Sequence, residues 1–317
     1  MIRLFSIENG LIREIPCTRD ELPEQLLKAQ WIDAHEPDES ERALLESLLR
    51  TDLPESDEVE EIESSARYFV DQVGLHVHSL FLGFSDGRHQ TVSVACILQS
   101  ERLITIREGD LADFRLLRLR ARRGQVEASS PQDLLVTLLE QKVENHADTL
   151  EDLHRQLEKV SYLVLEDEEA ELEDAIGKLA RLEDATGKIR LCLMDTQRTI
   201  SFLLRHLRCE PDEAETLREI MRDVETLMSH TAFLFDKINF LMDSTQGFIN
   251  IEQNQIIKIF SIAAVVFLPP TLVASIYGMN FEYMPELRWL FGYPWALGLM
   301  VLTGIAPYWY FKRKGWL

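Results

Sequence analysis

The chain has 317 residues, 54 of them acidic and 33 basic, which gives a formal net charge of −21. This length allows one large domain or two modest domains. The charge is uneven: residues 259–317 carry two acids and four bases, so the first 258 residues hold a net charge of −23. The field of this acidic part repels anionic lipid and excludes nucleic acid as a partner. It attracts cations, but acidic surfaces usually serve solubility alone, so composition does not by itself predict a cation site.

Residues 1–125 are expected to form a cytosolic α+β domain with a mostly antiparallel sheet. The opening MIRLFSIENG lacks an apolar core of signal-peptide length, so we expect this part to stay in the cytosol. The four cysteines form no CxxC pair, which fits a reducing compartment without disulfides. The patterns predict a strand over Trp31–Asp33, a capped helix over Asp38–Arg50, one or two strands over Tyr68–Phe84 with a turn at Gly74, two strands over Val92–Arg107 broken near Gln99–Glu101, and a linker over Gly124–Pro131.

Residues 126–255 are expected to be helical and to include a stalk. Apolar residues at helical spacing predict one long helix from Gln132 and a second over roughly Glu168–Leu207. A turn over Cys209–Asp212 follows, and Asp212 is the predicted N-cap of a third helix.

The third helix is predicted to run without interruption into the apolar end of the chain. Between Pro211 and Pro269 there is no proline, and Gly247 is the only glycine. A helix from Asp212 to Tyr277 would be about 100 Å long, at 1.5 Å per residue. Such a helix needs neighbours on several sides, so we expect it to pack against the two preceding helices or against copies of itself around a central axis.

Two uncharged stretches, Ile259–Phe281 and Trp289–Phe311, each have 23 residues, which is enough to cross a bilayer as a helix. Lys258 precedes the first stretch and Lys312–Lys314 follow the second, and basic residues beside a span favour the cytoplasmic side. Both termini are therefore expected to be cytoplasmic. The aromatic ends of the second stretch suit a lipid-facing outer helix. The expected division is a first transmembrane helix over 256–281, an external loop over 282–288, a second transmembrane helix over 289–311 and a basic cytoplasmic tail over 312–317.

One face of the first predicted span carries small and polar residues. At about 100° per residue these positions fall within a sector of about 100°. Such a face packs against other helices or faces water, and the sequence leaves both alternatives open. Two spans cannot enclose a pore, so a pore would need several subunits. Pro269 and Pro270 either permit bending or set a static kink. The candidate pore-lining residues are Asn254, Ile257, Ser261, Ala264, Leu268, Thr271 and Ser275.

Tyr277-Gly278-Met279-Asn280-Phe281, followed by Met284-Pro285-Glu286-Leu287, resembles the CorA family of divalent-cation transporters. The motif ends the first of two C-terminal spans, and the acidic domain and long helix match the same layout over essentially the whole chain. The resemblance implies a funnel-shaped homopentamer in a bacterial-type inner membrane. Gly278, Met279 and Asn280 would then form a ring at the outer mouth of the pore. Ser275 stands where family members often have glycine.

The resemblance implies that Mg²⁺ is the transported ion, with Co²⁺ and Ni²⁺ as secondary ions. Mg²⁺ gives up its water reluctantly, so a ring of neutral amide and carbonyl oxygens can bind the hydrated ion and release it again. Glu282 and Glu286 would raise the cation concentration at the entrance. Moving two charges down about 100 mV releases about 4.6 kcal/mol, so no ATP is required. No phosphate-binding loop or catalytic constellation is visible, so the chain is not expected to be an enzyme.

The family is also gated by Mg²⁺ bound between neighbouring cytosolic domains. Asp243 aligns with an acid of the family and is the preferred regulatory candidate. His76 and His78 share a strand face, but an HxH pair without a third ligand more often has a structural role. The other candidate acids, which could equally form solvated faces, are Asp52, Glu55, Asp57, Glu58, Glu60, Glu61 and the run Glu166–Asp174.

The sequence leaves two alternative functions open. A zinc-transporting branch of the same superfamily also carries Gly-Met-Asn, although the continuation Met284–Leu287 favours magnesium. A membrane-anchored coiled-coil sensor or scaffold that conducts no ion would share the long helix and the two spans.

Overall fold

The computed structural model describes residues 1–49, 67–166, 171–280 and 284–315. The chain divides into two compact units, Met1–Met242 and Asp243–Leu317. The long helix α8 (Pro211–Tyr277) contributes to both units.

The first unit contains a sheet of seven strands in the order β2-β1-β3-β7-β6-β5-β4. All neighbouring strands are antiparallel except β3 and β7, which confirms the prediction of a mostly antiparallel sheet. The strands predicted over Trp31–Asp33, Tyr68–Phe84 and Val92–Arg107 are present, with breaks close to the predicted places. The strands are β1 (Ile2–Glu8), β2 (Leu11–Ile15), β3 (Trp31–His35), β4 (Tyr68–Val70), β5 (Leu75–Ser85), β6 (Arg88–Leu98) and β7 (Leu103–Arg107).

Strands β1 and β2 were not predicted from the sequence. They form a hairpin whose two-residue turn, Asn9-Gly10, has positive φ at both positions, 54° and 79°. Asn-Gly between apolar runs is a strong hairpin signal, because both residues tolerate this backbone conformation. That signal is present in the sequence and could have revealed the hairpin.

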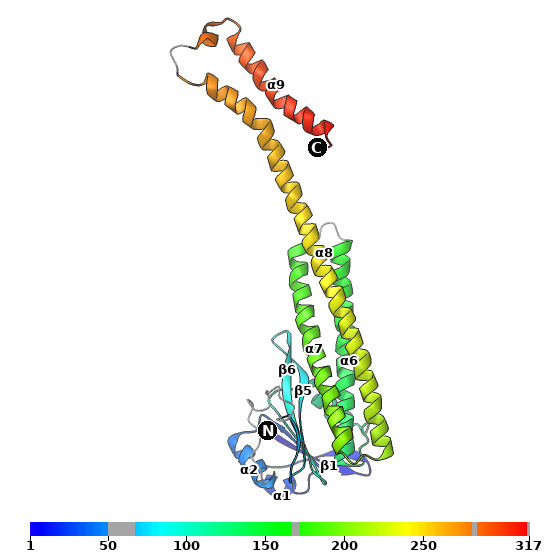
Figure 1. Cartoon of the computed structure of the whole chain (residues 1–317). Helices are drawn as coiled ribbons and strands as arrows, with labels where there is room; N and C mark the ends of the chain where they lie inside the picture. Colours follow the sequence, from blue (N-terminus) through cyan, green and yellow to red (C-terminus); the bar gives the residue numbers. More distant parts are fainter. Residues whose placement is uncertain (50–66, 167–170, 281–283, 316–317) are drawn as a thin grey trace. The chain divides into compact units, whose positions relative to one another are not determined.

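Helices cover both faces of the sheet (Figure 1). Helices α1 (Leu22–Leu26) and α2 (Glu39–Leu49) pack on the face that carries Ile32, Ile97 and Ile104. Asp38 caps α2, since its Oδ1 accepts the Glu41 backbone N–H at 2.8 Å. On the other face lie α5 (Ala112–Arg122), α6 (Pro131–Leu165), α7 (Leu172–His206) and the first part of α8. Helix α5 was not predicted.

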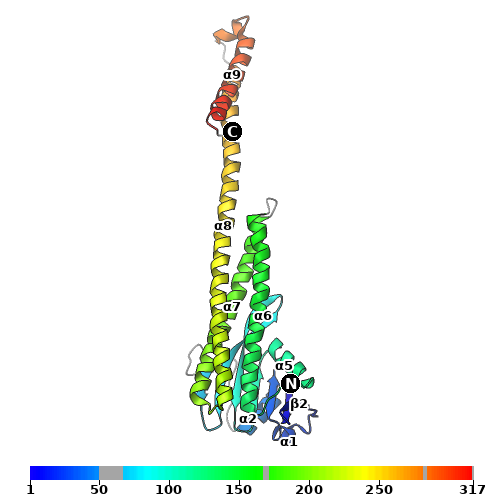
Figure 2. The same ribbon diagram turned by 90° about the vertical axis from the view of Figure 1, so that its right-hand side faces the viewer.

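The α6, α7 and α8 helices share one apolar core with the sheet, and in both views the first two run alongside the beginning of α8 (Figure 1, Figure 2). The boundary expected between residues 125 and 126 therefore lies inside one compact unit. The segment Gly124–Pro131 is more than a linker, because Val126 and Ala128 are buried in this core and Glu127 bridges to Leu11.

The start of α8 corrects the predicted cap. The helix begins at Pro211, so Asp212 lies in its first turn and is not the N-cap. Glu210 takes the cap position, because its carbonyl accepts the Ala214 N–H at 3.0 Å. The Glu213 carboxylate accepts the Glu210 N–H at 2.9 Å, which satisfies a donor that would otherwise have no partner. The predicted start of the second long helix lies partly outside the described residues, and α7 is described from Leu172.

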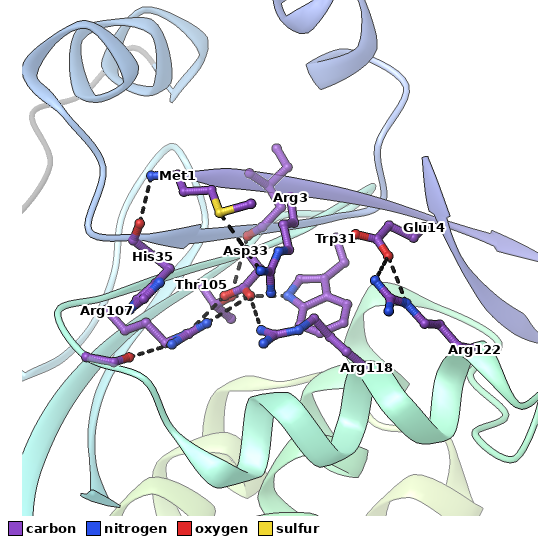
Figure 3. A network of polar contacts seen from close by, with 12 residues as sticks. Met1, Arg3, Glu14, Trp31, Asp33, His35, Thr105, Arg107, Arg118 and Arg122 are labelled. Carbon is purple, nitrogen blue, oxygen red and sulfur yellow. Dashed lines mark hydrogen bonds and ion pairs between the residues drawn. The ribbon is translucent and has the colours of Figure 1, made fainter. Parts of the chain in front are cut away.

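A buried charge cluster ties the sheet to α5 (Figure 3). The Asp33 carboxylate on β3 is fully buried and accepts from Arg107 at 3.1 and 3.2 Å and from Arg118 at 2.9 Å. Thr105 donates to the same carboxylate at 3.2 Å, and the Trp31 indole donates to Thr105 at 3.1 Å. Two arginines thus share one buried carboxylate. Arg107 and Thr105 lie on β7, the parallel neighbour of β3.

A second buried network lies between β5 and α7. Asp195 of α7 accepts from Ser79 and the backbone N–H of Leu80, both at 2.7 Å, and from Tyr68 at 2.6 Å. The fully buried Lys142 of α6 donates to Ser79 at 2.8 Å. This network crosslinks four elements of the first unit: β4, β5, α6 and α7.

His76 and His78 are both buried on β5, beside the ring of Phe69. Burial lowers the pKa of His78 to about 4, so its imidazole is neutral near pH 7. Within the described residues no three His, Cys, Asp or Glu side chains are arranged to hold a metal ion.

The second unit contains the end of α8, the 3₁₀ helix η1 (Pro285–Arg288) and α9 (Gly292–Arg313). Helix α9 begins three residues after the predicted start of the second span at Trp289, and it includes Lys312 and Arg313, which were expected in the tail. Within the described residues α8 is the one helix that is long and apolar enough to cross a membrane. The tyrosine, tryptophan, glycine and proline of α9 lower its apolar character, so composition alone does not assign it to a membrane.

Candidate functional site

The candidate site is one face of α8 and the turn that follows it. The seven residues predicted to line a pore are all exposed in the single chain. Leu268 is 65% exposed and Ile257 is 61% exposed, although both are large apolar side chains. Among the described residues of a single chain, no element covers this face.

Helix α9 covers the opposite face of α8. Gly304 brings the two helices close together: a Cβ atom at that position would lie 3.3 Å from Pro270 and 3.7 Å from the Val266 carbonyl oxygen. At about 100° per residue, the half-buried residues point about 180° away from the predicted pore face. They are Ile262, Ala263, Val266, Pro270, Val273 and Tyr277, and half-buried Pro269 lies at the edge of the same face.

The two prolines do not interrupt α8, which stays helical through Pro269 and Pro270. Their missing N–H groups leave the carbonyls four residues earlier, on Val265 and Val266, without their usual donors. The Thr271 hydroxyl donates to the Phe267 carbonyl at 2.8 Å. Because its proton is used within the helix, the Thr271 oxygen can offer only lone pairs to a ligand on the exposed face.

The Gly-Met-Asn segment ends α8 in a tightened turn. The Gly278 N–H donates to the Ala274 carbonyl at 2.9 Å, and the Met279 N–H donates to the Ile276 carbonyl at 3.3 Å. A Cβ atom on Gly278 would lie 3.1 Å from the Ala274 carbonyl oxygen, so glycine relieves crowding in this turn. Gly278, Met279 and Asn280 are all exposed, as a ligand ring requires.

Of the two predicted entrance acids, one lies within the described residues. Glu286 lies exposed on η1, whereas Glu282 lies outside the described residues. A Cβ atom on Gly292 would lie 2.2 Å from the Glu286 carbonyl oxygen, so only glycine allows η1 to pack on the start of α9. The backbone of Glu286 is thereby held beside the second helix.

Three more polar residues extend the exposed face of α8 toward the N-terminus of the helix. Asp243, Gln246 and Asn250 are exposed and lead to Asn254 in steps of three or four residues. The Gln246 amide donates to the Asn250 side-chain oxygen at 3.4 Å. Gln246 and Asn250 were not among the predicted pore-lining residues, which began at Asn254, although the same spacing continues through them.

Few of the remaining regulatory candidates lie within the described residues. Residues 50–66 and 167–170, which include most of the predicted gating acids, lie outside the described residues. Asp174 forms an ion pair with Lys178 at 2.7 Å, and this hydrogen bond lowers the pKa of its carboxyl. Asp243 lies on the same face as the candidate pore residues.

A family model described as "CorA-like Mg2+ transporter protein" matches residues 27–313. The chain belongs to this family. The CorA family consists of transporters, so the match confirms the predicted family and the prediction that the chain is not an enzyme.

Relatives within the CorA family match the chain from end to end. The magnesium transport protein CorA of Escherichia coli K12 is 49% identical, and the match covers 100% of both chains. The protein of the same name from Salmonella typhimurium is 48% identical, again over 100% of both chains.

Two solved structures support the fold. The complete CorA magnesium transporter of Methanocaldococcus jannaschii has a TM-score of 0.75 at 21% identity and covers 100% of this chain and 98% of its own. The full-length CmaX protein has a TM-score of 0.70 at 18% identity, covering 98% and 96%. At these identities the likeness speaks for the fold alone: an α/β domain, a long helix and C-terminal helices.

Proposed function

We propose that this CorA-family chain is a Mg²⁺ uptake channel of the bacterial-type inner membrane, driven by the membrane potential. The observation that carries the proposal is the uncovered face of α8, which leads from Asp243 to Asn280. The near-identical length and the 49% identity to magnesium transport proteins support Mg²⁺ as the ion.

The pore is formed by several copies of α8, each of which contributes its uncovered face. In this arrangement α9 crosses the membrane as the outer helix, because it covers the side of α8 that points away from the pore. The resemblance to CorA favours five copies, with both termini in the cytoplasm. Exposed Leu268 then forms a constriction, and Thr271 and Ser275 supply hydroxyl oxygens above it.

Selection takes place at the ring of Gly278, Met279 and Asn280. A neutral amide oxygen binds the waters of a hydrated divalent cation without removing them, which suits the slow dehydration of Mg²⁺. Glu286, together with Glu282, raises the local cation concentration through its charge. Two charges that move inward across about 100 mV release about 4.6 kcal/mol, which is sufficient to drive uptake.

The test is isotope or fluorescence uptake by the full-length protein in proteoliposomes under an imposed potential. Native protein is expected to take up Mg²⁺, with slower flux of Co²⁺ and Ni²⁺, and Asn280→Ala is expected to abolish the flux. Gln156→Ala removes an exposed amide of α6 and serves as the control. Zn²⁺ flux above Mg²⁺ flux would establish the zinc alternative, and no flux from native protein would favour the scaffold.

Regulation by internal Mg²⁺ is assigned to Asp243. A carboxylate on the pore face can bind a cation that has reached the cytosolic side and hold the closed arrangement. Asp243→Asn is expected to leave uptake intact while raising the internal Mg²⁺ concentration that stops it. Unchanged inhibition by internal Mg²⁺ would remove Asp243 from this role.

A further inference from the structure

An open groove of about 470 Å³ lies between α8 and α9 in the second unit. Its walls are mainly apolar, and its polar groups, Gln255, Lys258 and Tyr308, gather toward one end of the two helices. The helices touch at Gly304, one turn before Tyr308 along α9. The apolar wall consists of Ile259, Ile262, Ala263, Val266 and Phe267.

The groove opens away from the candidate pore. Ile259, Ile262 and Val266 lie opposite Ser261 and Leu268 on α8, at about 100° per residue. If the uncovered face points to a central axis, the groove faces the surrounding bilayer. This step rests on the proposed function, since the pore sets which way each face points.

Positive charge surrounds the polar end of the groove. Lys258 forms no ion pair with any described residue, and the nearest acid before it on α8, Glu252, is six residues away, beyond side-chain reach along a helix. Helix α9 ends in Lys312 and Arg313, and the Arg313 guanidinium lies 5.4 Å from the centre of the Trp309 ring. Basic pockets between membrane helices on the cytoplasmic side attract anionic headgroups.

We propose that this groove is a binding site for an anionic phospholipid of the cytoplasmic leaflet. One acyl chain lies against the apolar wall, and the phosphate is bound by Lys258 with the Tyr308 hydroxyl and the Gln255 amide. An open apolar groove at membrane depth is filled by hydrocarbon, because water gains no hydrogen bonds from such a wall. Lys258, the cation in the lining of the groove, selects a headgroup with net negative charge.

Lipid binding to the full-length protein in detergent can be titrated by native mass spectrometry, with dioleoylphosphatidylglycerol compared with dioleoylphosphatidylcholine. Phosphatidylglycerol is expected to bind more tightly, and Lys258→Gln is expected to weaken it about five-fold, the equivalent of about 1 kcal/mol per basic residue. Ala263→Leu, which fills the groove without changing charge, is expected to weaken both lipids. Lys237→Gln removes a lysine from α8 in the first unit and should change nothing.

Equal binding of the two lipids, or unchanged binding by both Lys258→Gln and Ala263→Leu, would overturn the proposal. A crosslink between Val266→Cys and a neighbouring chain would assign the groove to a second copy and overturn the proposal as well. The readout is lipid retention and needs no ion flux. Mg²⁺ uptake without a preference for phosphatidylglycerol would therefore contradict the lipid site alone. A preference for phosphatidylglycerol without Mg²⁺ uptake would contradict the proposed function alone.

Discussion

Gly304 of α9 lies against Pro270 of α8, and a Cβ atom at Gly304 would lie 3.3 Å from the Pro270 Cγ atom. The contact combines the residue without a side chain on one helix with the proline ring on the other. Close approach of this kind is how membrane helices gain packing contacts in the absence of a hydrophobic driving force.

Gly304→Val is expected to push the two helices apart and to destabilise the second unit by about 1–3 kcal/mol, the usual range for overpacking. Gly298→Val is the matched control, because a Cβ atom there meets nothing within 4 Å. The melting temperature of the full-length protein in detergent measures both. Equal melting temperatures would mean that the Gly304 contact does not position α9.

Cysteine labelling can distinguish the two faces of α8. In a background with Cys17→Ser and Cys209→Ser, Asn250→Cys and Ser261→Cys lie on the uncovered face. A charged, water-soluble thiol reagent is expected to block Mg²⁺ flux at these two positions. Ile262→Cys and Val273→Cys lie on the face turned toward α9 and should be unreactive. Similar labelling at all four positions would contradict a water-lined face.

Asp33→Ala is expected to be one of the most destabilising single changes in the first unit. It leaves the buried guanidinium of Arg107 without its carboxylate, and breaking a buried pair in this way costs about 3–5 kcal/mol. Glu14→Ala breaks the pair with Arg122, whose side chain is 64% exposed, and should cost at most about 1 kcal/mol. Thermal unfolding of the two variants gives the comparison (Figure 3), and equal losses would contradict it.

Asp113 makes the stability of the first unit depend on pH. Its carboxyl is fully buried, and burial raises its pKa to about 6, above the unfolded value of about 3.9. The folded state therefore holds the proton more tightly, so this contribution to stability is complete below about pH 4 and is lost as the pH rises through 6.

Asp113→Asn removes that loss. Between pH 5.5 and 8, the free energy of unfolding of the variant should therefore rise by about 1 kcal/mol relative to that of the native chain. Burial also lowers the pKa of His146 to about 4. The effect of His146 on stability cancels in the comparison, because the native chain and the Asp113→Asn variant both contain it. Melting temperatures across this range measure the gain. A difference that does not change with pH would show that Asp113 does not titrate there.

The local pattern of the sequence determined most of the strands and the long helices of this protein. Alternation along Tyr68–Arg107 predicted its strands, and the absence of proline before Pro269 predicted an uninterrupted α8. The spacing from Asn254 to Ser275 placed the candidate residues on one face, as observed. Such features follow from hydrogen bonds and side-chain periodicity within a few residues, so the sequence carries them directly.

Only the tertiary structure decided which surfaces are covered. The parallel pairing of β3 with β7, which joins segments about 70 residues apart, puts Arg107 beside the buried Asp33. The contact of Gly304 with Pro270 decides that α9 covers one face of α8 and leaves the other open. Burial depends on which distant segment packs on a given face, and no local spacing specifies that choice.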